Sequence, residues 1–175
     1  MDDMFIYAGH GERGRISFCD TDPNQRIVTG EIVKGTIIAH DYMNDSLTTF
    51  PNHHCINELP NNHLVNARCV LYLACRSGKS YTSSYGTYNL IDETFNKGAH
   101  FVLGATEKIT EAHVDPWMEE FFASAKRGNS IEQCIEDADK KIGNITYNTD
   151  YGQGTCYGLP VYTRGDQKQY WSIGG

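Results

Sequence analysis

The sequence predicts an α/β fold with a mostly parallel sheet. Three short apolar runs, at residues 4–8, 68–74 and 101–105, have the length and composition of strands buried within such a sheet. Segments with a helical spacing of apolar residues follow the second and the third run. Because strands that alternate with helices usually build a parallel sheet, we expect one α/β domain over residues 1–175.

The first half of the chain is predicted to consist mainly of strands. In order, the pattern indicates a strand buried on both faces at 4–8, a turn at 12–14, a short strand at 16–19, further short strands over 27–39 with breaks at Gly30 and Gly35, and a long polar excursion over 40–66 with one helical turn near 56–59. A connection of that length in a compact domain usually has a functional role or is mobile.

The second half contains the predicted helices. In order, we expect a buried strand at 68–74, a Ser-, Tyr- and Gly-rich loop at 78–86, a helix at 88–96, a strand at 101–105, a helix from 115 that ends at Gly128, a helix at 131–142, a loop at 152–158, a strand at 159–162, a turn at 164–167 and a closing strand at 169–172. Asp115 and Pro116 fit the N-cap and the first helical position, and Ser130 with Gln133 fits a capping box.

The charge balance excludes some functions. The formal net charge of −7, from 15 basic and 22 acidic residues, leaves no basic excess to neutralise phosphates, so no nucleic-acid partner is expected. No apolar stretch approaches the roughly 20 residues that span a bilayer, so no membrane partner is expected either. The acidic start, Met1-Asp2-Asp3, leads directly into a predicted strand and does not resemble a signal peptide.

The cysteines indicate a reducing compartment. There are six, at positions 19, 55, 69, 75, 134 and 156, without Cys-x-x-Cys spacing. In a chain without a signal peptide, this favours free thiols over disulfides and a cytoplasmic location. Cys69 and Cys134 are interpreted as small buried apolar residues. The cluster His53-His54-Cys55 lacks the paired spacing of zinc sites, so we interpret it as a polar loop.

Two predicted strands each end in a reactive residue beside glycine. His10 lies between Gly9 and Gly11 after the first strand, and Cys75 follows the second strand directly. In α/β sheets, ligands bind beyond the carboxyl ends of the strands, where both residues fall. Taken singly, each fits a structural role, as a turn histidine or a buried cysteine. Taken together, they predict a thiol nucleophile and its imidazole base.

These two motifs resemble those of a known family. Residues 5–11 (FIYAGHG) and 71–78 (LYLACRSG) resemble the paired His and Cys motifs of caspase-like (clan CD) cysteine peptidases, most closely the CHAT and gingipain-type branches. Residues 97–105 resemble the strand that follows in those families, and 117–130 resemble the helix pair after it. The resemblance covers residues 4 to 142 in broad layout and implies a caspase-like three-layer sandwich.

The sequence departs from the family pattern before the His-bearing strand. In those families, two further strands and helices precede the His-bearing strand, which here begins at the N-terminus. The resemblance therefore implies an N-terminally incomplete domain in which one edge of the first strand lies bare. Besides a peptide or protein substrate, an upstream regulatory domain or a partner protein is then expected.

The resemblance also implies a mechanism. Cys75 would attack a peptide carbonyl to form an acyl-enzyme, while His10 would protonate the leaving amine and then activate water. The backbone N–H groups of Gly11 and Cys75 would bind the oxyanion, and no metal or organic cofactor is required. Thr106 and Glu107 are candidates for a wall of the substrate pocket. Glu107 could receive a basic side chain, although a solvated loop carboxylate explains it equally well.

Two alternatives to a peptidase stay open. A catalytically inactive caspase-like interaction or scaffold module would use the same fold without turnover, and a bare strand edge favours it. Hydrolysis or transfer at a non-peptide acyl group would use the same two side chains. Selective alkylation of Cys75 that depends on His10 would separate an enzyme from a scaffold.

Overall fold

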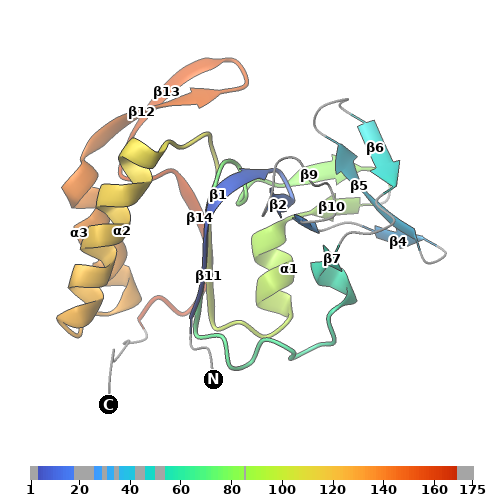
Figure 1. Cartoon of the computed structure of the whole chain (residues 1–175), viewed down its shortest axis with the longest axis horizontal. Coiled ribbons are helices and arrows are strands. Elements are labelled where there is room, and N and C mark those ends of the chain that lie inside the picture. Colours follow the sequence, from blue (N-terminus) through green and yellow to red (C-terminus); the bar gives the residue numbers. More distant parts are fainter. Residues whose placement is uncertain are drawn as a thin grey trace. The chain divides into compact units, whose positions relative to one another are not determined.

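The chain forms two compact units. The computed structural model describes residues 4–17, 26–28, 31–33, 36–41, 46–49, 54–84 and 86–168 (Figure 1). The first unit comprises residues 1–106 together with 161–165, and the second comprises residues 107–160 together with 166–175. In the described part of the chain, no helix is long and apolar enough to cross a membrane.

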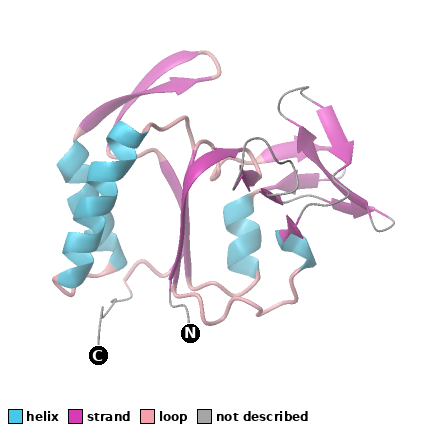
Figure 2. Ribbon diagram, viewed as in Figure 1, coloured by secondary structure: helices cyan, strands magenta, loops and turns pink. Residues whose placement is uncertain are grey.

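The first unit is built on a seven-stranded sheet, coloured magenta in Figure 2. In spatial order its strands are β14 (Val161–Gly165), β11 (Phe101–Ala105), β8 (Cys69–Ala74), β1 (Met4–Glu12), β2 (Arg15–Ser17), β3 (Arg26–Val28) and β7 (His54–Cys55). The three central strands, β11, β8 and β1, are parallel. β14 and β2 run antiparallel to their neighbours, and β3 and β7 again run parallel to each other. Five of the seven strands thus share one direction, which confirms a mixed α/β fold with a mostly parallel sheet.

The centre of this sheet is the most buried part of the unit. All six residues of β8 and all five of β11 are buried, as expected for continuous apolar strands in a parallel sheet. Helix α1 (Leu90–Asn96) packs on the sheet through Leu90 and Ile91, which are fully buried in one core with Tyr72 and Val102. Figure 1 shows α1 beside the sheet, with the 3₁₀ turn η1 (Ile56–Glu58) nearby.

Two smaller sheets complete the first unit. β4 (Glu31–Val33), β5 (Thr36–Asp41) and β6 (Ser46–Thr49) form an antiparallel sheet, and β9 (Tyr81–Ser83) pairs with β10 (Gly86–Tyr88) in a hairpin. The short strands over 27–39 and the helical turn near 56–59 were correctly predicted. The prediction of a loop over 78–86 was wrong. Tyr81 and Tyr88 are buried against each other with ring centroids 5.4 Å apart, and this packing stabilises strands whose polar composition resembles a loop.

The first strand differs from its prediction. We expected β1 to be buried on both faces, but only Tyr7 is buried among its nine residues, and Phe5 is 39% exposed. The pairing gives the reason: β8 borders residues 4–9 on one side, whereas β2 pairs only with His10, Gly11 and Glu12. No other described strand pairs with residues 4–9, so β1 has less cover than β8.

The second unit contains two helices and a hairpin. These are α2 (Glu111–Lys126), α3 (Ile131–Ile142), β12 (Asn144–Thr149) and β13 (Gly152–Tyr157). Trp117 stacks on Phe121 with ring centroids 5.2 Å apart, and both side chains are fully buried. The Trp117 indole donates a 2.7 Å hydrogen bond to Asp139, whose carboxylate also accepts from the Leu159 N–H. Burial raises the pKa of this carboxyl group.

Helix boundaries in the second unit test the predicted caps. α3 begins after Ser130, whose hydroxyl accepts from the Gln133 N–H as predicted. The predicted start of α2 at 115 was wrong. The helix begins at Glu111, after Thr110, and Pro116 lies inside it. Val114, two residues before Pro116, is buried, and the helix accommodates Pro116 although proline cannot donate a backbone hydrogen bond there.

The hairpin of the second unit was missed. Residues 152–158 were predicted as a loop, but β13 pairs along its whole length with β12. The Asn, Gly, Thr and Gln residues of this segment are also common in loops, so the composition did not indicate a strand. The structure shows cross-strand packing instead. A Cβ at Gly154 would lie 2.7 Å from the ring of Tyr147, so this ring covers the glycine. β14 matches the predicted strand at 159–162 only in part, and the predicted closing strand at 169–172 lies outside the described residues.

Candidate functional site

The register of β1 and β8 brings His10 and Cys75 to the same end of the sheet. The two strands are parallel neighbours, and Gly9 pairs with Ala74. His10 and Cys75 are the next residues on their respective chains, so they leave this pair side by side. The parallel pairing of the two strands ends here, at the carboxyl end of β8 and toward that of β1, where α/β sheets usually bind ligands.

The sequence suggested that His10 lies in a turn after the first strand. In the structure it lies inside β1. It pairs with Ser17 of β2, and the turn follows at Arg13 and Gly14. The Tyr7 hydroxyl lies 2.9 Å from the His10 carbonyl oxygen and also contacts the Ser17 carbonyl oxygen. The backbone of His10 is thereby fixed between two strands, while the residue itself is exposed to solvent.

Gly11 lies against the backbone beside the candidate nucleophile. A Cβ at this position would lie 2.6 Å from the Ala74 Cβ and 3.2 Å from the Cys75 carbonyl oxygen. A side chain would therefore clash, and glycine permits the close approach of the two chains. The two residues whose N–H groups were predicted to bind an oxyanion are thus neighbours.

A tight loop follows Cys75. Arg76 has φ of 57°, in the left-handed region, which costs a non-glycine residue about 1–3 kcal/mol and occurs often at functional sites. Its side chain is only 3% exposed. Ser77 is fully buried, and its hydroxyl donates a 2.7 Å hydrogen bond to the Tyr72 carbonyl oxygen. The loop therefore folds back onto the strand that leads into it.

Gly78 anchors this loop to the neighbouring strand. Its N–H donates a 2.8 Å hydrogen bond to the Ala105 carbonyl oxygen at the end of β11. A Cβ on Gly78 would lie 2.3 Å from the Gly104 carbonyl oxygen, so no side chain fits. The contact with β11 therefore requires glycine at this position.

The cysteines differ in access. Cys75 is half-buried and is not in a disulfide, whereas Cys55, Cys69 and Cys134 are buried, as predicted for the last two. Cys156, in the second unit, is also half-buried. Burial and the nearby Asp139 carboxylate raise the pKa of the Cys156 thiol, which disfavours its reactive thiolate form. These environments make Cys75 the strongest candidate for selective modification among the described cysteines.

The two residues predicted as a wall of the substrate pocket, Thr106 and Glu107, belong to different units. Thr106 is half-buried and is the residue after β11, at the same end of the sheet as Cys75. Glu107 is also half-buried but belongs to the second unit. Its role as an acceptor of a basic side chain stays a prediction.

Asn89 was not predicted as part of the site. This residue is 5% exposed and caps α1, and its side-chain amide also reaches the loop after Cys75. An Asn directly before a helical apolar pattern is a recognisable N-cap signal, but the contact with the loop depends on tertiary structure.

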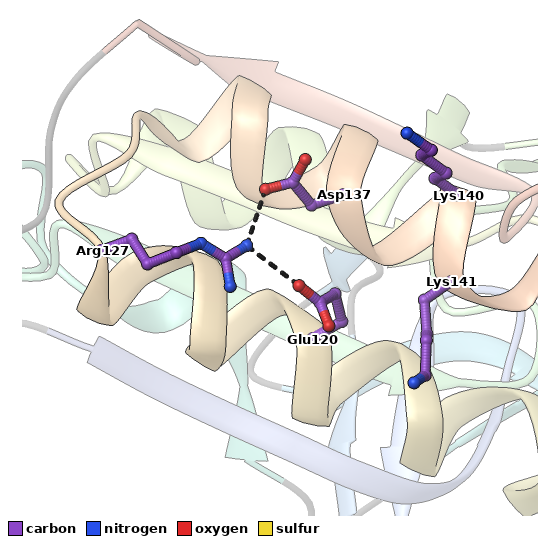
Figure 3. Close-up of a pocket in the computed structure, with 5 residues that line it drawn as sticks. All are labelled: Glu120, Arg127, Asp137, Lys140 and Lys141. Atoms are coloured by element: carbon purple, nitrogen blue, oxygen red, sulfur yellow. Dashed lines mark hydrogen bonds and ion pairs between the residues drawn. The ribbon is translucent and has the colours of Figure 1, made fainter.

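Two pockets among the described residues are lined by neither His10 nor Cys75. An apolar cavity of about 360 Å³ in the first unit borders Phe5 and Val70, near the amino ends of β1 and β8. In the second unit, a pocket of about 270 Å³ contains Arg127, which bridges Glu120 and Asp137 at 2.9 Å each (Figure 3). The Ser124 hydroxyl and then other donors, including Arg127, lower the pKa of Asp137, so this pair links α2 to α3 as ions.

Among the described residues, no group of three or more His, Cys, Asp or Glu side chains is arranged to hold a metal ion. Comparison of the chain with family models, curated proteins and solved structures gives no match. The resemblance to caspase-like peptidases therefore depends on the residues of this chain alone.

Proposed function

We propose that this chain is a cysteine endopeptidase in which Cys75 is the nucleophile and His10 is the general acid and base. The observation that carries the proposal is the parallel pairing of β1 with β8, in which Gly9 and Ala74 are partners and the two reactive residues follow side by side. We further propose that the sheet belongs to a caspase-like three-layer sandwich.

The chemistry needs few groups. The Cys75 thiolate adds to the peptide carbonyl, and the resulting oxyanion is bound by the N–H groups of Gly11 and Cys75. His10 gives its proton to the leaving amine, which breaks the peptide bond and leaves a thioester on Cys75. Water then loses a proton to His10 and attacks the thioester, which releases the carboxylic acid and restores the Cys75 thiolate beside a protonated His10.

Three features of the site support this reading. Cys75 is half-buried and is not in a disulfide, so its thiol is neither sealed in the core nor oxidised. Gly11 leaves no side chain between β1 and the Cys75 backbone. The buried Arg76, with its left-handed backbone, is a local irregularity at the predicted reacting residue, where such irregularities are often functional. Free thiols also fit the cytoplasmic location that we propose.

Peptide hydrolysis by purified full-length chain tests the proposal. A fluorogenic peptide library that covers each residue type before the cut should be cleaved by the unaltered chain. We expect Cys75→Ala to abolish cleavage and His10→Ala to reduce it by about 10²–10⁴-fold, the usual contribution of a general acid or base. Cys156→Ala, which removes the half-buried thiol of the second unit, is the matched control and should retain full activity.

The alternative is a caspase-like interaction module without turnover. It is favoured by β1, since no described strand pairs with residues 4–9 on the side away from β8, and an extended peptide could bind there. Absence of cleavage, combined with equal alkylation of Cys75 in the unaltered chain and in His10→Ala, would reject the peptidase and favour this module. Cleavage of ester substrates alone would instead indicate a non-peptide acyl substrate.

A further inference from the structure

Asn89 links the start of α1 to the loop after Cys75. Its Oδ1 accepts hydrogen bonds from the N–H groups of Ile91 and Asp92, at 2.8 and 3.3 Å. Its Nδ2 donates to the Gly78 carbonyl oxygen at 2.9 Å and to the Ser80 hydroxyl at 3.0 Å. The two N–H donors identify the oxygen end of the amide, so the nitrogen must face the loop.

Gly78 is thereby held from two directions. Its N–H bonds to Ala105 of β11, and its carbonyl bonds to Asn89 at the start of α1. The Lys79 N–H closes the loop on the Arg76 carbonyl oxygen at 2.9 Å. The segment between Cys75 and Ser80 therefore has little freedom to shift along or away from the sheet.

We propose that Asn89 is a positioning residue for Cys75, an inference that depends on the proposed peptidase function. A nucleophile and its oxyanion donors must be held close to one geometry, and a displacement of about 1 Å can cost about 100-fold in rate. The Cys75 N–H is one of the proposed donors and lies three residues before Gly78. A tether at Gly78 fixes this N–H and the thiol together, relative to His10 on the next strand.

The tether can be separated from the helix cap. Serine is as good an N-cap as asparagine, so Asn89→Ser keeps an acceptor for the first turn of α1 but is too short to hold Gly78. Asn89→Asp keeps the acceptor as well, but it replaces the donor with an oxygen that faces the Gly78 carbonyl oxygen. If Asn89 acted only as a cap, both substitutions would be almost without effect on Cys75.

The test measures how strongly Cys75 depends on His10. The rate of Cys75 alkylation by iodoacetamide at pH 7 is followed by peptide mass spectrometry in the unaltered chain, His10→Ala, Asn89→Ser and the double variant, with Cys156 as internal reference. In the unaltered background, we expect His10→Ala to slow alkylation by at least about tenfold. In the Asn89→Ser background, the same substitution should change the rate by less than about threefold, which is a loss of coupling.

A matched control addresses stability. Ser130→Ala removes the side-chain cap of α3 in the second unit and should lower stability without altering the tenfold dependence on His10. Hydrogen exchange gives a second measure that needs no catalysis: backbone amides of residues 76–80 should exchange faster in Asn89→Ser and Asn89→Asp than in Ser130→Ala.

The outcomes distinguish the two proposals. If the unaltered chain shows no dependence on His10, the proposed peptidase fails and the positioning role fails with it. If that dependence is present and remains tenfold in both Asn89 variants, the peptidase stands and the positioning role is overturned. Unchanged exchange at residues 76–80 would overturn it too, whatever the alkylation rates.

Discussion

β1 and β8 are parallel neighbours that both begin with an apolar run, yet they differ in burial and in pairing. β8 is buried at each of its six residues, whereas β1 is buried only at Tyr7. β8 lies between two parallel strands, while β1 shares most of its length with β8 alone. Position in the sheet, rather than apolar composition, determines how firmly each strand is held.

The difference between the strands also applies to the two residues that we propose as catalytic. Cys75 leaves the fully packed strand and enters a loop held by Ser77, Gly78 and Asn89. His10 lies on the less covered strand and is itself exposed. We therefore expect the Cys75 thiol to have a fixed position and the exposed His10 imidazole to have more freedom.

The largest predicted effect compares two residues that pair across these strands. Leu71 of β8 is fully buried, and its register partner Ile6 of β1 is half-buried. Leu71→Ala should lower the free energy of unfolding by about 3–5 kcal/mol, since it removes a packed side chain and leaves a cavity. Ile6→Ala should cost less than half as much. Urea unfolding of both variants measures the difference, and equal costs would remove the contrast between the strands.

A second prediction uses pH to probe the buried strand. Burial raises the pKa of Tyr72 to about 12, an effect that the Thr94 hydrogen bond only partly offsets. The folded chain therefore favours the neutral phenol. The raised pKa contributes about 2–3 kcal/mol to the free energy of unfolding. This contribution is complete below pH 10, the pKa of the unfolded chain, and is lost as the pH rises toward 12.

Tyr72→Phe provides the reference for this measurement. The free energy of unfolding is determined from pH 9 to 12 for both chains. Over this range the unaltered chain should lose about 2–3 kcal/mol more than Tyr72→Phe. Parallel pH curves would show that water reaches the Tyr72 hydroxyl and that β8 is less protected than its burial indicates.

The smallest predicted effect compares two glycines near the ends of the strands. A Cβ at Gly78 would lie 2.3 Å from a backbone oxygen of Gly104, which cannot move easily, and Gly78→Ala should cost about 1–3 kcal/mol. A Cβ at Gly9 of β1 would meet the Tyr7 hydroxyl at 2.8 Å. Because this is a side chain rather than backbone, Gly9→Ala should cost less than Gly78→Ala, although the Tyr7 hydroxyl would have to give up part of its contact with the His10 carbonyl oxygen. Thermal unfolding of the two variants gives the comparison, and a reversed order would contradict it.

The sequence was most informative where residue composition alone determines the structure. The uninterrupted apolar runs predicted β8 and β11, and the carboxyl ends of parallel strands predicted that His10 and Cys75 would lie together. The hairpins β9–β10 and β12–β13 were missed, because Thr, Tyr, Asn and Gly occur in loops as often as in short hairpins. Only the pairing of Tyr81 with Tyr88, and the cover of Gly154 by Tyr147, distinguishes the two cases.

Other errors arose from contacts distant in sequence. Pro116 was interpreted as the start of a helix, whereas α2 begins at Glu111, and Val114 in its first turn is buried. The exposure of β1 depends on how far β2 pairs along it, and the spacing of apolar residues carries no information about this register. Asn89 gave a local cap signal, but its bond to Gly78 could not be anticipated without the fold.

The close approach of Gly78 and Gly104 has an evolutionary consequence. A Cβ on Gly104 would lie 2.9 Å from the Gly78 nitrogen and 2.4 Å from the Ile91 Cδ1. An alanine at either position would clash unless the opposite segment shifts. We therefore expect the two glycines to be conserved together. In any related sequence, we expect both to be retained or both to be lost together with a rebuilt loop. This pair is therefore a more selective marker of descent than the short motif around the cysteine.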